Sequence, residues 1–173
     1  MSAPLPEVWL RGPLPDVPAL LQPVAHSLLQ CREEAHRKLA DLSPAQLTER
    51  PGGAASVAFH VTHAMGSLDR LFTYARGAQL DETQLAALRA EPSANEQAVD
   101  SHALLRTFDA AVDRALTQVR DTHVGDLLAA REVGRGRLPS TVIGLLFHAA
   151  EHTQRHLGQA VTTARIVRGT PAR

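Results

Sequence analysis

The chain has 173 residues, 44% of them apolar and 21% charged, which is the composition of one soluble globular domain with a real core. Lysine plus arginine equals aspartate plus glutamate at 18 each, so the charge balance gives no support for a nucleic-acid partner. There is no run of eighteen apolar residues and no basic start followed by an apolar stretch, so we expect neither a membrane span nor a secretory signal.

The first fifty residues are predicted to form a lead-in and one long helix. Residues 1–15 contain four prolines and should be an extended lead-in, pinned by Trp9. Apolar residues recur at spacings of three and four from 17 to 42, which predicts the first long helix. Ser43 and Pro44 are typical of the start of a short helix that follows it.

The middle of the chain is predicted to contain the second long helix and a short connecting helix. Pro-Gly-Gly at 51–53 breaks the chain, and an apolar stripe then predicts a helix over 54–75, which Gly77 ends. The segment LDETQLAALRAE at 80–91 predicts the short helix, and 92–97 reads as a loop.

Two further long helices complete the pattern. One is predicted over 100–119 and the other over 139–167, separated by a glycine-rich turn at 131–140. With no convincing strand pattern, four such helices predict an all-α fold, a four-helix bundle, as one domain over 1–173 with a tail at 168–173. The long second connection permits a crossover instead of a simple up-down arrangement.

Cysteine and aromatic residues are scarce. Cys31 is the single cysteine, which excludes a disulfide framework and favours a reducing compartment, so we expect a cytoplasmic protein. Aromatic residues make up only 3% of the chain, so the core should consist mostly of leucine, valine and alanine, which favours helices.

Three of the nine histidines lie four residues apart in HAAEHTQRHLGQA at 148–160. Residues at i and i+4 share a helical face, so two imidazoles can converge on one ion at about 2.0–2.1 Å. His148 and His156 are about 12 Å apart along the axis and cannot easily share an ion. The candidate pairs are therefore His148 with His152, and His152 with His156. Partial exposure, or hydrogen bonds to a neighbouring helix, is the alternative interpretation.

The sequence HAAEH also matches H-x-x-E-H, the inverted zinc-peptidase motif, in which Glu151 would be the general base. That motif requires a third protein ligand, ordinarily a glutamate well downstream. No acidic residue follows His152, so the peptidase interpretation fails.

A third ligand should come from a facing helix, where FHVTH at 59–63 offers His60 and His63. On a helical wheel His60 lies about 60° from the centre of the apolar stripe and His63 about 120°, so periodicity alone favours His60. The isolated histidines are interpreted as surface or helix-end residues: His26, His36, His102 and His123.

Two segments resemble the DinB family of bacterial metal-binding four-helix bundles. HTQRHLGQ at 152–159 is similar to the family's H-x-x-x-H-x-G-Q ending. SVAFHVTHAMGSLDRL at 56–71 resembles its helix-two motif, in which the ligand histidine follows a serine by seven residues, and that count leads to His63. The resemblance runs from the first helix to about residue 168. It implies a metal site of His63, His152 and His156, with the duplicate histidines at 60 and 148 leaving the register open.

Three imidazoles leave at least one coordination position free, which is typical of a catalytic site, and both zinc and nickel suit such ligands. Some relatives in the family transfer or isomerise with a low-molecular-weight thiol such as bacillithiol or mycothiol. The resemblance therefore implies a metal-dependent thiol transferase, or a hydrolase, acting on a small electrophilic substrate, and we expect a homodimer. The alternatives are a stress-related protein that binds metal or a small ligand without catalysis, and a structural helical dimer.

The sequence identifies no catalytic side chain for such a reaction. The thiol would come from the cofactor, because Cys31 shows no sign of activation and is interpreted as a small buried hydrophobic residue. Arg131, Arg135 and Arg137 precede the fourth long helix and would suit an anionic cofactor, although a solvated loop is the favoured interpretation.

Overall fold

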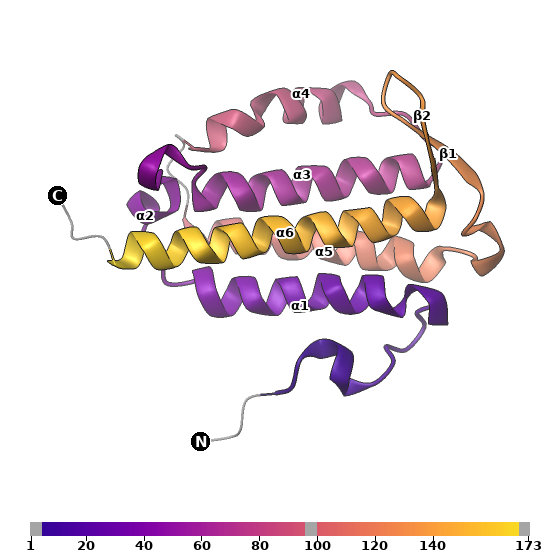
Figure 1. Cartoon of the computed structure of the whole chain (residues 1–173), viewed down its shortest axis with the longest axis horizontal. Coiled ribbons are helices and arrows are strands. Elements are labelled where there is room, and N and C mark those ends of the chain that lie inside the picture. The colour runs from indigo at the N-terminus through magenta and orange to yellow at the C-terminus, as the bar shows by residue number, and fades with distance from the viewer. Residues whose placement is uncertain (1–4, 96–99, 170–173) are drawn as a thin grey trace.

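In the computed structural model, which describes residues 5–95 and 100–169, four long helices pack side by side (Figure 1). They are α1 (Gln22–Leu39), α3 (Val57–Ala75), α5 (Ser101–Asp121) and α6 (Val142–Gly169). Helix α1 packs against α5 and α6, and α3 packs against the same two helices, so α1 and α3 lie diagonally across the bundle. The predicted all-α four-helix bundle is confirmed.

The second connection is a crossover that contains the predicted short helix, α4 (Glu82–Ala90). It returns the chain along the bundle, so α3 and α5 run in the same direction (Figure 1). Near the end of both helices, Gln118 Nε2 donates to the carbonyl of Phe72 at 2.9 Å. Helix α6 runs antiparallel to α3 and parallel to α1, and Arg168 near its end donates to the carbonyl of Lys38 at 2.7 Å.

Side-chain caps set where several helices begin. The Ser56 hydroxyl accepts the N–H of Phe59, so α3 begins at Val57 and not at the predicted residue 54. Ser43 forms a capping box at the start of α2 (Pro44–Thr48), as its position before a proline predicts. A short 3₁₀ turn, Pro51–Gly53, separates α2 from α3.

The amino-terminal segment differs from the prediction of an extended lead-in pinned by Trp9. Val8–Arg11 forms a 3₁₀ turn in which Trp9 is 60% exposed. Val8 is the buried residue, at 3% exposure, and its N–H donates to Gln30 Oε1 at 2.9 Å. The prediction was wrong because a small aliphatic side chain fits the surface of α1 there, while the indole N–H reaches only Glu7. Residues 1–4 of the lead-in lie outside the described part of the chain.

The first helix is also shorter than predicted. Ala19–Leu21 forms a 3₁₀ turn, and the α-helix begins only at Gln22, whose side chain bonds back to the chain at Leu14 and Val17. The predicted loop after α4 contains a 3₁₀ turn, Glu91–Asn95, and its last two residues lie outside the described part of the chain. Helix α6 extends into the predicted tail as far as Gly169.

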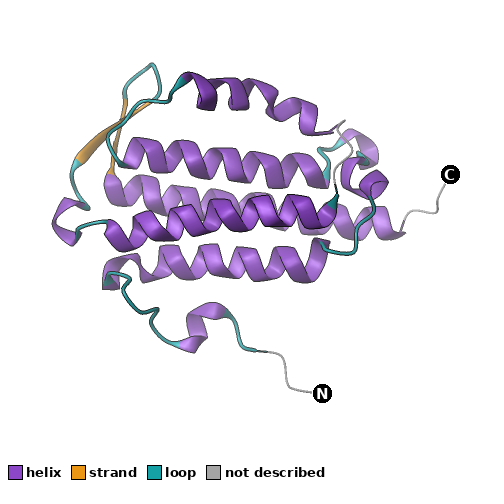
Figure 2. Cartoon of the chain, turned by 180° about the vertical axis from the view of Figure 1, so that it is seen from behind, coloured by secondary structure: helices purple, strands orange, loops and turns teal. Residues whose placement is uncertain are grey.

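The segment predicted as a glycine-rich turn is a β-hairpin (Figure 2). Strand β1 (Ala130–Val133) pairs antiparallel with β2 (Leu138–Thr141), with Val133 opposite Leu138. Gly134 and Arg137 adopt positive φ angles of 66° and 48° and reverse the chain between the strands. Neither strand has a buried face, so the sequence carries no alternating apolar pattern, and the turn prediction was wrong for that reason. A 3₁₀ turn, Val124–Asp126, precedes the hairpin.

The core between the long helices is aliphatic, as the composition predicts. Its largest fully buried side chains are mostly leucine and valine with one phenylalanine, Phe108. Over the described ranges, no helix is long and apolar enough to cross a membrane.

Candidate metal site

Helix α6 places two histidines on the side that packs against α3. Buried residues on both sides of this pair, Ala149 and Leu157 among them, fix the rotation of the helix, and His152 and His156 lie toward α3. His148 lies elsewhere: half of its side chain is exposed, and its Nδ1 is 3.1 Å from Oε2 of Glu151.

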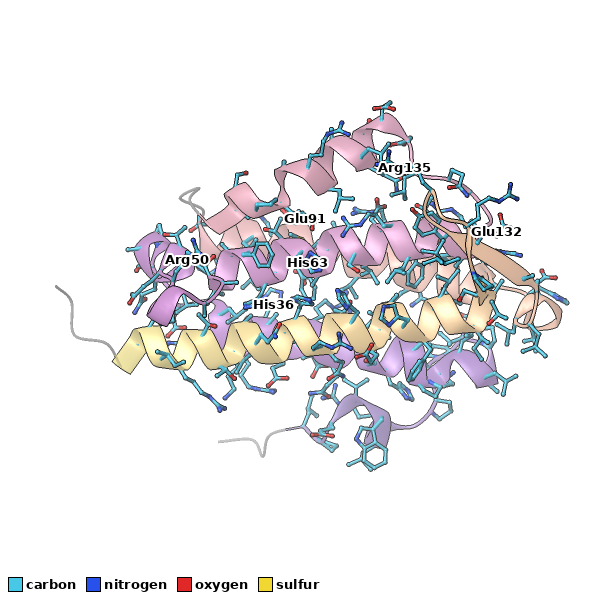
Figure 3. All side chains as sticks on the ribbon, turned by 45° about the horizontal axis from the view of Figure 1, so that its top comes forward. His36, Arg50, His63, Glu91, Glu132 and Arg135 are labelled. Atoms are coloured by element: carbon cyan, nitrogen blue, oxygen red, sulfur yellow. The ribbon has the colours of Figure 1, made fainter. Side chains whose placement is uncertain are left out.

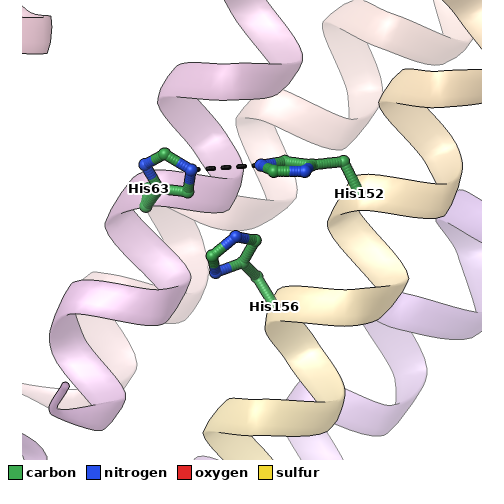
Figure 4. Close-up of side chains that lie close together, drawn as sticks. All are labelled: His63, His152 and His156. Atoms are coloured by element: carbon green, nitrogen blue, oxygen red, sulfur yellow. Dashed lines mark hydrogen bonds between the residues drawn. The ribbon is translucent and has the colours of Figure 1, made fainter. Parts of the chain in front are cut away.

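Helix α3 brings both of its histidines against this pair. Nε2 of His63 is 3.1 Å from Nε2 of His152 (Figure 4). Nδ1 of His60 is 3.2 Å from Nδ1 of His156. The His63 ring also lies beside the His156 ring, with their centroids 4.4 Å apart.

Three of these side chains can share one ion. His63, His152 and His156 each offer a ring nitrogen, and the three nitrogens lie within 4.8 Å of one another. Two imidazole nitrogens bound to one ion at about 2.0–2.1 Å are about 3.3 Å apart in tetrahedral geometry, close to the His63–His152 separation. The cluster could therefore hold a metal ion, and it combines the residues that the DinB resemblance implies.

His60, which the helical wheel favours, is not in this cluster. His60 is buried, while His63 is half-buried. A wheel ranks positions by burial, and in that respect it was right. The three-histidine cluster lies toward the edge of the interface, where solvent reaches all three residues.

A carboxylate fixes the ring of His63. Oε2 of Glu91 lies 2.7 Å from its Nδ1, and a carboxylate can only accept a hydrogen bond. Nδ1 of His63 must therefore carry a proton, and in the neutral imidazole the lone pair belongs to Nε2, the nitrogen that points at His152. This carboxylate–histidine pair is typical of metal sites, in which it orients the ligand.

His152 has the complementary arrangement. Because Nε2 of His63 is an acceptor, Nε2 of His152 is the donor across the 3.1 Å contact. Its Nδ1 is then an acceptor, and among the described residues this buried atom has no hydrogen-bond partner. An ion held by Nε2 would require the other tautomer of His152, with the ring proton on Nδ1.

Burial and repulsion between imidazoles lower the pKa of His60, His152 and His156. Burial, followed by the positive charges of His63 and His152, lowers the pKa of His156 to about 4. Burial is also the main cause that lowers the pKa of His152 and of His60, and His63 adds to it in both cases. Neutral imidazoles are the form that binds a metal, so little proton release is needed at neutral pH.

Glu151, the general base of the rejected peptidase motif, does not reach the cluster. It pairs with Arg155 on the outer side of α6, and that hydrogen bond is the main cause that lowers the pKa of its carboxyl. The geometry agrees with the exclusion made from the sequence.

The other candidate residues are also away from the histidines. Nε of Arg131 donates to the carbonyl of Ala75 at 2.8 Å, and Arg137 pairs with Glu132 across the hairpin, where Figure 3 also places Arg135. Cys31 is 1% exposed, and burial raises the pKa of its thiol to about 12, as expected for a small buried hydrophobic residue.

Glu91 is the site residue that the sequence did not identify. Figure 3 shows it beside His63, at the start of the 3₁₀ turn after α4. It lies 28 residues from its histidine, and one acid in a connecting segment has no spacing that points to a partner. Only the crossover path of the chain brings it to α3.

Comparisons with known proteins agree with this description. The sequence profile described as DinB superfamily matches residues 27–160, which include the three clustered histidines. The chain belongs to the DinB superfamily. A solved structure described as a conserved protein from Enterococcus faecalis has the same fold, with a TM-score of 0.69 at 20% identity over 87% of this chain and 98% of that one. No curated protein matches the chain by sequence.

The residues of this DinB superfamily member fit a divalent metal. Two observations support the fit: three imidazole donors, and nitrogen separations suited to one ion. Zinc and nickel both take such ligands.

Proposed function

We propose that His63, His152 and His156 bind a divalent metal, zinc or nickel, and that the protein is a transferase that joins a low-molecular-weight thiol to a small electrophile. The observation that carries the metal part is the convergence of three ring nitrogens within 4.8 Å. The low pKa of His156 supports it, because a neutral ring keeps its lone pair for the ion.

Partial exposure of the cluster supports catalysis over a structural metal. All three histidines are partly exposed, and three protein ligands leave a position that solvent or a substrate can occupy. The core between the four helices is apolar and excludes the histidines, so we expect the bundle to fold without an ion. A bound divalent ion would supply Lewis acidity, which stabilises a thiolate at neutral pH.

The chain itself offers no reactive thiol in its described part, which supports an external one. Cys31 is buried and its high pKa keeps it protonated, so it cannot be the nucleophile. The neighbouring carboxylates are engaged as well, Glu91 with His63 and Arg70 and Glu151 with Arg155. Because the Lewis acidity of a bound ion would allow a thiol to ionise without a general base, we favour thiol transfer over hydrolysis.

The same engaged carboxylates favour a second candidate, a DinB protein that binds metal or a small ligand without catalysis.

Two measurements separate the candidates. Metal content is determined by mass spectrometry on protein purified without a nickel column. The metal-loaded protein is then incubated with monochlorobimane and one of three thiols: bacillithiol, mycothiol or glutathione. In this reaction the thiol sulfur forms a bond to carbon of the bimane as chloride leaves, and the thiol proton passes to water.

Metal with thiol-dependent turnover would support the transferase, and metal without turnover would support the second candidate. Protein that neither contains nor takes up zinc or nickel would contradict the transferase and the metal-binding form of the second candidate. The expected homodimer and the cytoplasmic location stay predictions.

A further inference from the structure

Helix α4 lies against the bundle although none of its residues is buried. A helix without a buried face gains little from the hydrophobic effect, so other contacts must hold it. At its first turn, Nε2 of Gln84 donates to Asp69 at 2.6 Å and to Thr73 at 2.8 Å, both on α3. Just after its other end, Glu91 contacts α3 at His63.

The Glu91 carboxylate is held between two partners on α3. One oxygen accepts from Nδ1 of His63 at 2.7 Å, and the other accepts from Nη1 of Arg70. Glu91 is only 6% exposed, and 12% of the Arg70 side chain is exposed. Burying a carboxylate is unfavourable unless it is paired and hydrogen-bonded, and here both oxygens have a charged or polar partner.

The Glu91 carboxylate occupies the space above residue 66 of α3, which is a glycine. A Cβ atom at Gly66 would lie 2.1 Å from Oε1 of Glu91 and 2.7 Å from Nη1 of Arg70. Glycine is an unfavourable residue inside a helix, and the φ angle here does not require it. His63, Gly66 and Arg70 follow at spacings of three and four, so they share one face of α3. On this face, Gly66 leaves space for the Glu91 carboxylate, and His63 and Arg70 donate hydrogen bonds to it.

We propose that Glu91 is a positioning residue, which holds His63 so that the Nε2 lone pair faces His152 and His156, and that the crossover through α4 delivers it. The orientation of His63 follows from the contacts of the metal-free protein. Its effect on metal binding rests on the proposed function.

Replacement of the carboxylate by an amide gives a specific expectation. Arg70 can only donate, so the amide oxygen of Glu91→Gln should face Arg70 and its NH2 group should face His63. A donor at this position favours the tautomer of His63 with the lone pair on Nδ1. The proton would then lie on Nε2, pointing into the cluster. A cation would have to displace that proton or turn the ring, and loss of such a partner typically weakens metal binding about 10–100-fold.

The first experiment needs no metal. Nitrogen-15 NMR of the histidine side chains distinguishes a proton on Nδ1 from one on Nε2, and it is recorded on the metal-free protein and on two variants. Glu82→Gln is the matched control, because Glu82 is an exposed acid in the first turn of α4, the helix that precedes Glu91. The wild type and the control should show His63 protonated on Nδ1, and Glu91→Gln should lose that signature. An unchanged His63 tautomer in Glu91→Gln would overturn the proposal.

The second experiment measures zinc affinity by competition with a chromophoric chelator. Glu91→Gln should bind zinc about 10–100-fold more weakly than the wild type, with Glu82→Gln unchanged. Gly66→Ala should give a similar loss with the carboxylate still present, because the new methyl group displaces it, and this variant decides the question if Glu91→Gln does not fold. Equal zinc affinity in all variants would overturn the positioning role. If the wild type binds neither zinc nor nickel, the proposed function fails, while the NMR result still decides whether Glu91 orients His63.

Discussion

Nε2 of His63 and Nε2 of His152 face each other at 3.1 Å from two antiparallel helices, although 89 residues separate them in the chain. Two neutral imidazoles in this position can share one proton or one cation. The rest of the cluster favours the cation, because His156 adds a third nitrogen and carries a pKa of about 4. The predictions below test the cluster, the helix surface that supports it, and the thiol.

The first prediction is that His156→Ala removes metal binding and thiol transfer while the bundle stays folded. Removing one of three protein ligands weakens the site sharply, and truncation at one interface position should cost about 1–3 kcal/mol against typical stabilities of about 5–15 kcal/mol. Metal content by mass spectrometry and helix content by far-ultraviolet circular dichroism measure the two parts.

His148→Ala is the matched control for this variant. It belongs to the same helix and the same four-residue series, but half of its side chain is exposed and it lies outside the cluster. It should keep full metal content. A control that loses the metal together with His156→Ala would show that His148 is a ligand and that the assignment of the pair is wrong.

The second prediction compares two helical glycines. Gly158→Ala on α6 adds a methyl group with no atom within 4 Å, so it should stabilise the protein by about 0.5–1 kcal/mol through helix propensity alone. Gly66→Ala has the same propensity gain but pushes against Glu91 and Arg70, and we expect a net loss of about 1–3 kcal/mol. Urea unfolding measures both. Stabilisation of similar size at both positions would mean that the Glu91 side chain moves away at no cost.

The sequence predicts the parts of this fold that have a periodic pattern. The four long helices have apolar residues at spacings of three and four, and the structure confirms them. The sequence left open whether the second connection is a crossover or a simple up-down turn, because the length of a connection does not determine its direction. The hairpin was missed since strands without a buried face have no apolar alternation.

The candidate site also has residues that the sequence predicts and one that it does not. His152 and His156 share a helical face by spacing alone, so the sequence brings them together without a structure. Periodicity favours His60 over His63 because it reports burial, and the family resemblance was needed to choose His63. Glu91 could not be found, because its role depends on a crossover path and on the space above Gly66.

The third prediction concerns the stability of the protein at acidic pH. Burial and the neighbouring histidines lower the pKa of His156 from 6.5 to about 4 in the folded, metal-free protein. Between these two values the unfolded chain binds this proton and the folded chain does not, so the free energy of unfolding falls as the pH falls. The contribution is fully present above pH 6.5 and is lost by about pH 4. Urea unfolding across this range should show a shallower decline for His156→Gln than for the wild type, and identical slopes would contradict the assignment.

The fourth prediction is that Cys31→Ala keeps the metal and any thiol transfer. The Cys31 side chain is buried in the core with a pKa of about 12, so at neutral pH it is a thiol without access to a substrate. Loss of its sulfur leaves a small cavity and should cost about 1 kcal/mol of stability. In the folded wild type, a disulfide reagent such as DTNB should react with it only at the rate of unfolding. Rapid labelling of the folded protein, or loss of bimane conjugation in Cys31→Ala, would show that the chain supplies its own nucleophile, and the case for an external thiol would fail.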